Sequence, residues 1–347
     1  MDDIDRYLLD FIQNDLPEEA EPFSAAAQDC GISQEELFKR LGVLLKDGSI
    51  RRISALLSAQ HLGYHSTLVA VKTAEAQADL TAARINQHPG VSHNYLRDGD
   101  YNIWFTLTIP GKKSLRREVE QLLEGMVYED IVLLPSLRRY KLRVHLPTGS
   151  SHGAAVDSRG VSSRDIAAGN STAENSAAGG LSAVTAPAVE LDTCDKGLLK
   201  EIQQPLPLVP RPWDEIGRRL GISGEEVVQR VHRLKQSGII RRISGALHHR
   251  QAGYSANGMA CFQIAEGGED EAGRLAAAFP EVSHCYLREV PERLGFPLFA
   301  MIHAKDKQSC RQIAARIAEA IAAQDFKILF STKEYKKVRT TYNPEDI

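Results

Sequence analysis

The sequence contains the same pattern twice. Residues 50–54 read Ile-Arg-Arg-Ile-Ser, and residues 240–244 repeat them in the same order. Residues 91–97 read Val-Ser-His-Asn-Tyr-Leu-Arg, and residues 282–288 differ from them at one position. The matches keep their order along the chain, with small drifts typical of loop insertions. Because a long-period repeat makes each copy one structural unit, the sequence predicts two copies of the same domain set.

A segment of different composition separates the copies. Residues 147–190 are rich in Ser, Ala, Gly and Thr and have few large apolar side chains. Such a segment cannot bury enough apolar surface to offset its ordering entropy, so we expect a flexible linker. A tether of this kind raises the effective concentration of each half near the other. We therefore expect the two halves to pair with each other.

Each copy begins with a helical pattern. Apolar residues recur at helical spacing in residues 4–12 and 37–45. Ser33 with Glu36, and Ser223 with Glu226 in the second copy, predict capping boxes at the start of a helix. A Gly-Ile-Ser step precedes both of these helices, which is typical of a helix-turn-helix. Two short strands should follow as wings, Ile50 to Leu57 and Ile239 to Leu247.

The remainder of each copy alternates between strand and helix patterns in the order βαββαβ, which is the ferredoxin-like plan. In the first copy we expect strands at 67–71, 91–97, 102–109 and 130–140 and helices at 74–88 and 112–125. In the second copy the corresponding segments are 259–264, 282–288, 297–304 and 326–335 for strands and 270–279 and 307–323 for helices.

These patterns predict an α+β fold, a tandem duplication of a winged helix-turn-helix plus a ferredoxin-like βαββαβ domain. The expected boundaries are winged helix-turn-helix 1 at 1–60, ferredoxin-like domain 1 at 61–146, the linker at 147–190, winged helix-turn-helix 2 at 191–250 and ferredoxin-like domain 2 at 251–347.

Composition limits the classes of function. The formal net charge is −3, whereas a protein that mainly holds DNA usually concentrates positive charge. No apolar run approaches the length of a membrane span, and the acidic start of the chain does not fit a secretion signal. The five cysteines are scattered without a Cys-x-x-Cys pair, so neither a disulfide framework nor a thiolate metal site is indicated. We expect a cytoplasmic protein that does not contact membranes.

The layout of both halves resembles the Lrp/AsnC superfamily of regulators. Within it, the run His-Asn-Tyr-Leu-Arg-Asp-Gly-Asp-Tyr-Asn-Ile-Trp-Phe at 93–105 resembles the siroheme decarboxylases. Residues 284–288 and 299–303 carry the same resemblance in the second half. The first half resembles one subunit type of that family and the second half its partner, so the chain is similar to a natural fusion of the two.

The resemblance implies an enzyme, a carbon–carbon lyase of the carboxy-lyase type. Its reaction would convert siroheme to 12,18-didecarboxysiroheme with release of two CO2, in heme d1 biosynthesis or in the alternative heme pathway. Siroheme is a polyanion, and guanidinium groups match carboxylates with two parallel hydrogen bonds. A proton must replace each lost CO2, and histidine is the usual donor near neutral pH. We expect no metal site and no cofactor beyond the iron of the siroheme substrate.

Polar triplets mark the candidate catalytic strands. Side chains alternate along a strand, so His93, Tyr95 and Arg97 should share one face. The second copy repeats this triplet at His284, Tyr286 and Arg288, and His303 lies in the adjacent predicted strand. A solvated sheet face is the alternative for the triplets, and a buried, hydrogen-bonded side chain is the alternative for His303. The candidate catalytic residues are His93, His284, His303 and Tyr95.

Candidate substrate-binding residues are cationic or aromatic side chains on the strands and their ends. They are Arg51, Arg52, Arg97, Tyr101, Trp104, Arg138, Arg241, Arg242, Tyr286 and Arg288. For the Arg51-Arg52 and Arg241-Arg242 pairs, interdomain ion pairs are the alternative. For Arg138 the alternative is a solvated strand end.

The two halves differ beside the triplets. The segment Asp98 to Asn102 becomes the longer Glu289 to Pro297, and proline removes a backbone donor at the position of Asn102. We therefore expect one productive site built from both halves.

A transcriptional regulator of the Lrp/AsnC type is the competing function. The expected recognition helix at 33–47 is neutral and the one at 223–236 is barely basic, so DNA is disfavoured as a partner. A non-catalytic tetrapyrrole carrier is a third class. A homodimer, or association with related decarboxylase subunits, stays open at this point.

Overall fold

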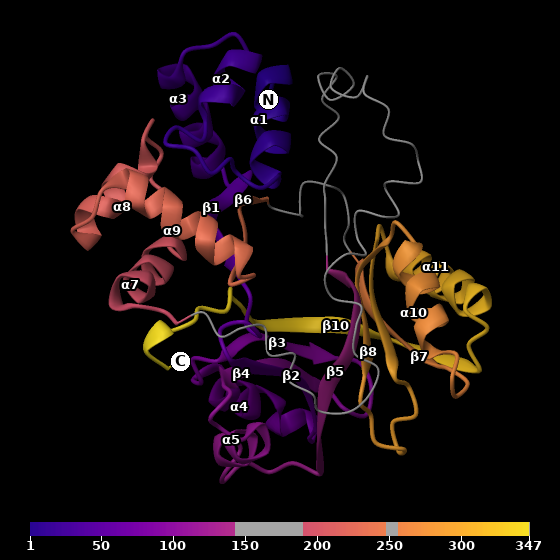
Figure 1. Cartoon of the computed structure of the whole chain (residues 1–347). Helices are drawn as coiled ribbons and strands as arrows, with labels where there is room; N and C mark the ends of the chain where they lie inside the picture. Colours follow the sequence, from indigo (N-terminus) through magenta and orange to yellow (C-terminus); the bar gives the residue numbers. More distant parts are fainter. Residues whose placement is uncertain (143–189, 248–255, 347) are drawn as a thin grey trace. The chain divides into compact units, whose positions relative to one another are not determined.

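The computed structural model describes residues 1–142, 190–247 and 256–346 (Figure 1). The segment predicted as a linker, 147–190, lies outside these ranges except for Glu190. The described residues form two compact units. The helical unit combines residues 1–61 with 190–247, and the sheet unit combines residues 62–142 with 256–346. Both copies of the repeat therefore contribute to each unit.

The helical unit contains two helix-turn-helix segments, as predicted. The first is formed by α1 (Asp3–Gln13), α2 (Ser24–Asp29) and α3 (Gln34–Lys46), followed by β1 (Ile50–Leu57). The second is formed by α7 (Thr193–Ile202), α8 (Pro212–Leu220) and α9 (Gly224–Gln236), followed by β6 (Ile240–Leu247). The apolar face of each helix is buried, with Leu8, Ile12 and Leu37 fully inaccessible to solvent. None of the helices in the described ranges is long and apolar enough to cross a membrane.

The predicted capping boxes at the start of α3 and α9 are only half formed. Ser33 Oγ accepts a hydrogen bond from the backbone N–H of Glu36, at 3.2 Å. The Glu36 carboxylate does not return the bond to Ser33, because it accepts from Arg40 Nε at 2.9 Å instead. Complete capping boxes occur at α1 and α7, where Asp2 and Asp192 are the N-caps.

The two predicted wing strands pair with each other. β1 and β6 form an antiparallel two-stranded sheet in which Ser54 lies opposite Ser244. Backbone bonds also cross the duplication, from Leu16 N to Ile243 O and from Leu206 N to Ile53 O, both at 2.8 Å. The two predicted wing strands are therefore confirmed as strands, and each finds its partner in the other half.

The sheet unit has the predicted βαββαβ order twice. The first copy comprises β2 (Tyr64–Lys72), α4 (Glu75–Asn86), β3 (Val91–Arg97), β4 (Ile103–Pro110), α5 (Leu115–Leu122) and β5 (Asp130–Leu142). The second comprises β7 (Ala256–Gln263), α10 (Glu269–Ala278), β8 (Val282–Arg288), β9 (Leu298–Ala304), α11 (Lys307–Ala320) and β10 (Asp325–Lys337). The predicted α+β fold with a tandem duplication is confirmed.

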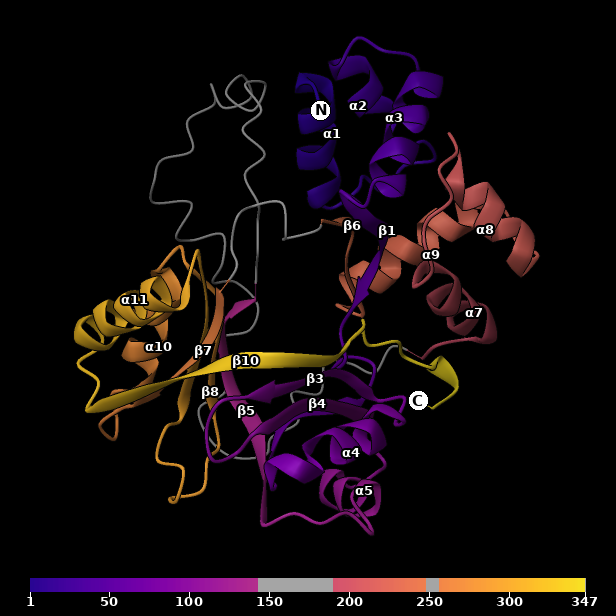
Figure 2. The ribbon, with the colours of Figure 1, turned by 180° about the vertical axis from the view of Figure 1, so that it is seen from behind.

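The strands of both copies close into one ring, in the order β10-β3-β4-β2-β5-β8-β9-β7. The long last strand of each copy joins them. β5 pairs with β2 through residues 130–135 and with β8 through residues 136–142, and β10 pairs in the same way with β7 and β3. Figures 1 and 2 show β10 alongside β3 from two opposite directions. The halves of the chain are therefore paired, as expected from the sequence.

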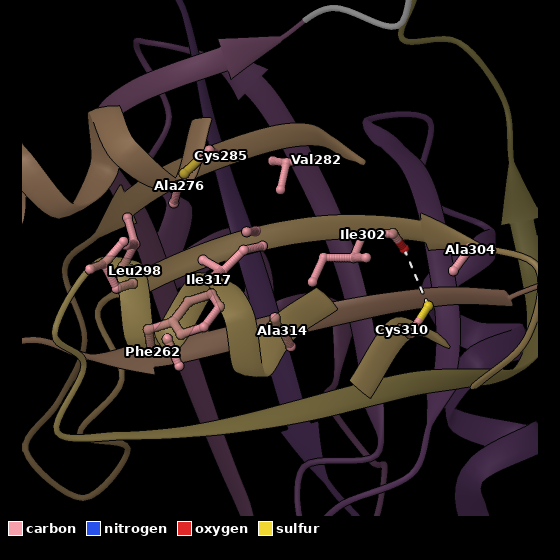
Figure 3. Packing of buried hydrophobic residues seen from close by; sticks show 14 of the residues in the cluster. Phe262, Ala276, Val282, Cys285, Leu298, Ile302, Ala304, Cys310, Ala314 and Ile317 are labelled. Carbon is pink, nitrogen blue, oxygen red and sulfur yellow. Dashed lines mark hydrogen bonds between the residues drawn. The ribbon is translucent and has the colours of Figure 1, made fainter. Parts of the chain in front are cut away.

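Helices cover one face of each half of this ring. In the first half, α4 and α5 bury Val69, Phe105 and Leu107 of the sheet. In the second half, Phe262, Ile302 and the α11 residue Ile317 pack together in the same way (Figure 3). Burying one such side chain contributes about 1.5–3 kcal/mol, so these two layers hold the strands in place.

The opposite face of the sheets carries a third cluster that both halves build. Its buried members are Ala70, Trp104, Val132, Leu134, Met259, Cys261, Leu294, Phe299 and Leu329. We call the strand face that carries this cluster the shared face. Strand alternation then directs every second side chain of the neighbouring strands toward it.

Candidate functional site

The β3 triplet lies on the shared face. Tyr95 is opposite Trp104 in the β3–β4 pair, and directly opposite residues share a sheet face. The rings of His93 and Tyr95 stack with centroids 6.2 Å apart, and the Arg97 guanidinium lies 5.4 Å from the Tyr95 centroid. Asn94 points the other way, where its Nδ2 donates to the carbonyl of Ala82 at 3.2 Å. The predicted common face of the triplet is confirmed.

His93 is half-buried and held by hydroxyl groups. Its Nδ1 lies 3.0 Å from Ser92 Oγ, and Ser92 Oγ lies 2.8 Å from Thr106 Oγ1. Burial lowers the pKa of His93 below its ordinary value of 6.5, and the nearby Lys337 cation lowers it further, against a weaker opposing effect of Glu334. A pKa lowered in this way favours the neutral form of the His93 ring at neutral pH.

Arg97 is a buried cation without a carboxylate partner in the described part of the chain. It is 5% exposed, so the solvated-face alternative does not hold at this end of β3. Its Nη1 donates to the carbonyl of Leu329 at 3.0 Å, and its Nε has no partner among the described residues. Burial lowers its pKa to about 10, which still leaves the group charged at neutral pH. Burying such a charge costs free energy unless an anion compensates it.

The β8 triplet repeats this arrangement. Arg288 lies 4.9 Å from the Tyr286 ring centroid and 5.8 Å from that of Phe299. Its Nη1 donates to the carbonyl of Leu134 at 2.7 Å, and its Nε lacks a partner in the described ranges. Burial again lowers the pKa to about 10. Arg288 is half-buried whereas Arg97 is buried, and each guanidinium is bonded to a carbonyl of the other half.

Two histidines accompany the β8 triplet. His284 lies opposite Met301 in the β8–β9 pair, and His303 follows two residues after Met301 on β9. Both histidines are half-buried. His303 Nε2 lies 2.7 Å from Ser283 Oγ, so the hydrogen-bonded alternative describes its contact correctly. The position on β9 nevertheless puts His303 on the same face as Phe299 and Met301.

Aromatic side chains join the two triplets. Trp104 and Phe299 occupy equivalent positions of β4 and β9, and their ring centroids are 6.4 Å apart with planes tilted by 56°. Trp104 Nε1 donates to the backbone carbonyl of Tyr101 at 2.7 Å. The two rings therefore belong to the buried cluster of the shared face.

The Tyr101 hydroxyl is held by Asp130 and Arg293. This hydroxyl donates to the Asp130 carboxylate, and Arg293 Nε approaches the Tyr101 oxygen at 3.3 Å and an Asp130 oxygen at 2.8 Å. Burial and the Asp130 carboxylate raise the pKa of Tyr101. Arg293 comes from the loop between β8 and β9, so this contact links the two halves. Sequence reasoning did not identify Arg293.

Arg138 has a partner of a different kind. It forms an ion pair with Asp270 of α10, which also accepts from the Tyr140 hydroxyl at 2.7 Å. The Asp270 carboxylate raises the pKa of Arg138. The solvated alternative does not describe this half-buried, ion-paired side chain, and the substrate contact stays a prediction. It connects β5 of the first half to a helix of the second.

The four remaining predicted arginines lie in the other unit. Arg51 and Arg52 are on β1, and Arg241 and Arg242 are on β6. Arg51 is exposed, and the other three are half-buried. Burial and the Arg51 charge lower the pKa of Arg52. The structure therefore does not bring these arginines together with the triplets within one unit.

Sequence reasoning missed Lys337, Ser92, Thr106 and Ser283 near the histidines. Lys337 lies opposite His93 because β10 of the second half pairs with β3. No local sequence pattern predicts this strand pairing. The two serines could have been found, since Val-Ser-His occurs in both copies. Among the described residues, no group of three His, Cys, Asp or Glu side chains is arranged to hold a metal ion.

Known families match the chain in both halves. Residues 5–51 and 195–241 match the siroheme decarboxylase NirDL-like HTH domain, and residues 61–141 and 251–336 match the AsnC-like ligand binding domain. A siroheme decarboxylase of Hydrogenobacter thermophilus is 36% identical over 98% of this chain and 95% of its own. The siroheme decarboxylase NirDL subunit of Paracoccus denitrificans is 31% identical over 97% and 96%.

Solved structures agree with these matches. The crystal structure of the siroheme decarboxylase NirDL superposes with a TM-score of 0.75 at 32% identity, over 99% of this chain and 96% of that one. A co-complex of NirDL with an iron-uroporphyrin III analogue gives a TM-score of 0.74. With relatives matched along nearly their whole length, the chain belongs to the siroheme decarboxylase family.

Proposed function

We propose that this enzyme is a carboxy-lyase that converts siroheme to 12,18-didecarboxysiroheme with release of two CO2. The product would serve heme d1 biosynthesis or the alternative heme pathway. The observation that carries the proposal is the pair of arginines, buried Arg97 and half-buried Arg288, on a face lined with histidines and aromatic rings. The full-length siroheme decarboxylases and the NirDL complex with an iron-uroporphyrin analogue support the choice of substrate.

Arg97 and Arg288 would bind substrate carboxylates. Each guanidinium uses Nη1 on a backbone carbonyl and has an Nε without a partner in the described residues. A carboxylate that reaches such a group gains a charge-assisted hydrogen bond in a poorly solvated setting. The aromatic rings of Trp104 and Phe299 would contact the plane of the macrocycle.

His93 would deliver a proton after carbon dioxide leaves. The bond between the acetate methylene carbon and its carboxylate breaks, and the electron pair stays on the methylene carbon, where the conjugated ring disperses it. A proton from His93 then joins that carbon to give the methyl group. Because Nδ1 contacts Ser92, Nε2 is the nitrogen that we assign to the transfer. We assign His93 as the main donor; His303 and His284 are the corresponding candidates of the second half, and the phenol of Tyr95 would orient the ring of His93.

The balance of this step requires a proton and no electron acceptor. We therefore propose that the iron of siroheme is the one metal involved and that no further cofactor takes part. Substrate carboxylates beside His93 would raise its pKa again, because a nearby anion favours the imidazolium. Substrate binding would thus favour protonation of His93, the proton donor.

Ion pairs within the helical unit count against the regulator alternative. Arg40 of α3 binds Asp2 at 2.8 Å and Asp5 at 2.9 Å, and Arg230 of α9 binds the corresponding Asp192 and Asp195 at 2.7 and 2.8 Å. Lys235 binds Asp15 and Glu18. Cations that already face carboxylates within the protein contribute little to phosphate binding.

The test is anaerobic incubation of the purified full chain with siroheme, followed by mass analysis of the extracted tetrapyrrole. Loss of two CO2 is the expected result. A shifted absorption spectrum without mass change would identify a carrier instead. Neither turnover nor binding, together with retention on DNA, would overturn the proposal in favour of the regulator. Size measurement of the same sample reports any homodimer, and adding a related decarboxylase subunit tests whether such a partner increases turnover.

A further inference from the structure

A serine occupies the same position beside the histidines in both halves. Ser92 and Ser283 are each 5% exposed and directly precede His93 and His284. In each half the pairing register shifts at this point, between Val91 and His93 and between Val282 and His284. Such a bulge re-aims a side chain that regular alternation would direct to the opposite face. The irregularity therefore lets a buried hydroxyl reach the shared face.

In the first half the hydroxyl belongs to a chain of three groups. Thr106 Oγ1 accepts from the backbone N–H of His93 at 3.2 Å and lies 2.8 Å from Ser92 Oγ. These distances fit a row in which Thr106 donates to Ser92 and Ser92 donates to His93 Nδ1 at 3.0 Å. Hydrogen bonds in such a row polarise and strengthen one another. With Nδ1 as an acceptor, the neutral ring carries its proton on Nε2.

In the second half the serine contacts a backbone carbonyl and a histidine nitrogen. The residue equivalent to Thr106 is Met301, and Ser283 Oγ donates to its backbone carbonyl at 3.4 Å. Ser283 Oγ also lies 2.7 Å from Nε2 of His303. A serine whose proton is directed to a carbonyl accepts from a ring N–H. In this arrangement Ser283 would accept from the Nε2–H of His303, whereas Ser92 would donate to Nδ1 of His93 and leave its Nε2 proton elsewhere.

We propose that Ser92, together with Thr106, and Ser283 are positioning residues that fix which nitrogen of His93 and of His303 carries the proton. The inference rests on the proposed function, because it selects His93 as the histidine that presents an N–H to the substrate. Neither serine needs to touch the substrate for this role. The halves thereby use equivalent serines on different histidines.

Nitrogen-15 NMR of the histidine rings tests the assignment in the ligand-free full chain. His93→Gln and His303→Gln identify the two sets of signals. We expect His93 to show the Nε2–H form, and Ser92→Ala to move it toward a mixture of tautomers. Thr106→Val should move it in the same direction, whereas Thr106→Ser, which keeps the hydroxyl, should not. Ser283→Ala should change the His303 signals and leave those of His93 in place.

Decarboxylation kinetics give the second readout. Ser92→Ala should lower kcat about fivefold to tenfold with KM nearly unchanged, which corresponds to the loss of one hydrogen bond. Thr106→Ser should retain the rate that Thr106→Val loses. If Ser92→Ala fails to fold, the Thr106 pair carries the test. Equal losses in Thr106→Ser and Thr106→Val, or an unchanged His93 tautomer in Ser92→Ala, would overturn the inference. Absence of turnover in the unaltered chain would refute the decarboxylase proposal and still leave the NMR result to decide the tautomers.

Discussion

The two halves of the sheet unit hold the same triplet and surround it differently. Arg97 and Arg288 both donate to a carbonyl of the opposite half, at equivalent positions of β10 and β5. The histidine surroundings diverge: the first half pairs His93 with hydroxyl groups and with Lys337, while the second half adds His303 and replaces Thr106 by Met301. The difference teaches that both halves hold the triplet arginine in the same way, whereas the groups that contact the histidines differ between the halves.

The loops beside the triplets diverge as well. Asn102 N donates to Val71 O at 3.1 Å, a bond that Pro297 cannot make, yet both residues accept from the triplet arginine's backbone N–H. In the longer second loop, Leu294 is 8% exposed and packs in the cluster on the shared face. Arg293 of the same loop donates to Asp130. The second loop therefore supports the first half's Tyr101.

Substitution of the aligned histidines His93 and His284 should give the largest difference in kcat between the two halves. We expect His93→Gln to lower kcat about 10²- to 10⁴-fold, the usual effect of losing a general acid, and His284→Gln to lower it at least about tenfold less. Accumulation of a product that has lost one CO2 in either variant would show that the histidines serve different acetates. Equal rates in the two variants, measured by mass analysis of the tetrapyrrole, would contradict a single productive site.

The arginines should respond alike, in contrast to the histidines. Arg97→Met and Arg288→Met should each weaken siroheme binding about 10- to 100-fold, because each removes about 1.5–3 kcal/mol of charge-assisted bonding. Arg116→Met on α5, where the side chain is 75% exposed, is the matched control and should leave Kd unchanged. Absorption titration measures all three. A normal Kd in Arg97→Met would remove this residue from the binding site.

Two ion pairs that connect the halves should contribute differently to the free energy of unfolding. Asp270 accepts from Tyr140 and pairs with Arg138, and Asp79 accepts from Tyr335 at 2.6 Å and pairs with Lys333 at 2.8 Å. Both carboxylates are largely exposed, so screening limits the effect. We expect Asp270→Asn to lower the free energy of unfolding by about 1 kcal/mol and Asp79→Asn by less, since arginine can form two parallel bonds. Urea denaturation checks the order, and the reverse order would be inconsistent with it.

The smallest effect should come from giving His93 the same opposite residue that His284 has, which is a leucine. Leu142 aligns with Lys337, so Lys337→Leu removes the cation opposite His93. The pKa of His93 should rise toward 6.5, although burial continues to hold it below that value. The protonated fraction near neutral pH then increases, and the alkaline limb of the rate profile moves to higher pH. An alkaline limb that stays in place would indicate that Lys337 does not act on His93.

The same depressed pKa has a consequence for stability. Below about pH 6.5 the unfolded chain binds a proton at His93 that the folded protein binds only at lower pH. This contribution to stability is therefore present above the unfolded pKa and is lost as the pH falls toward the folded pKa. In Lys337→Leu the loss should be smaller, which thermal unfolding at several pH values will reveal.

Much of the fold followed from local patterns. The bounds of β3 and β8 were predicted without error, because alternation and flanking turn residues define short strands well. Helix α5 begins at Leu115 rather than at the predicted residue 112, since Ser114 provides the N-cap. Duplication also indicated correctly that the halves pair.

Pairing partners were beyond the sequence patterns. Nothing local to residues 50–57 shows that they pair with β6, or that Lys337 lies opposite His93. The capping side chain of Glu36 was misassigned because Arg40 competes for it. Arg138 likewise has a partner on α10 that only the assembled unit provides. Contacts between residues distant in sequence depend on the whole chain, and these determine most of the candidate site.

The ring of strands has a consequence for synthesis on the ribosome. β10 is the last strand to be made, and it alone covers the free side of β3, while β8 covers that of β5. Until the second half emerges, the nascent first half exposes two unpaired sheet edges, which invite association with other chains. Slowing translation after residue 142 should therefore increase aggregation, and supplying the second half as a separate polypeptide should reduce it.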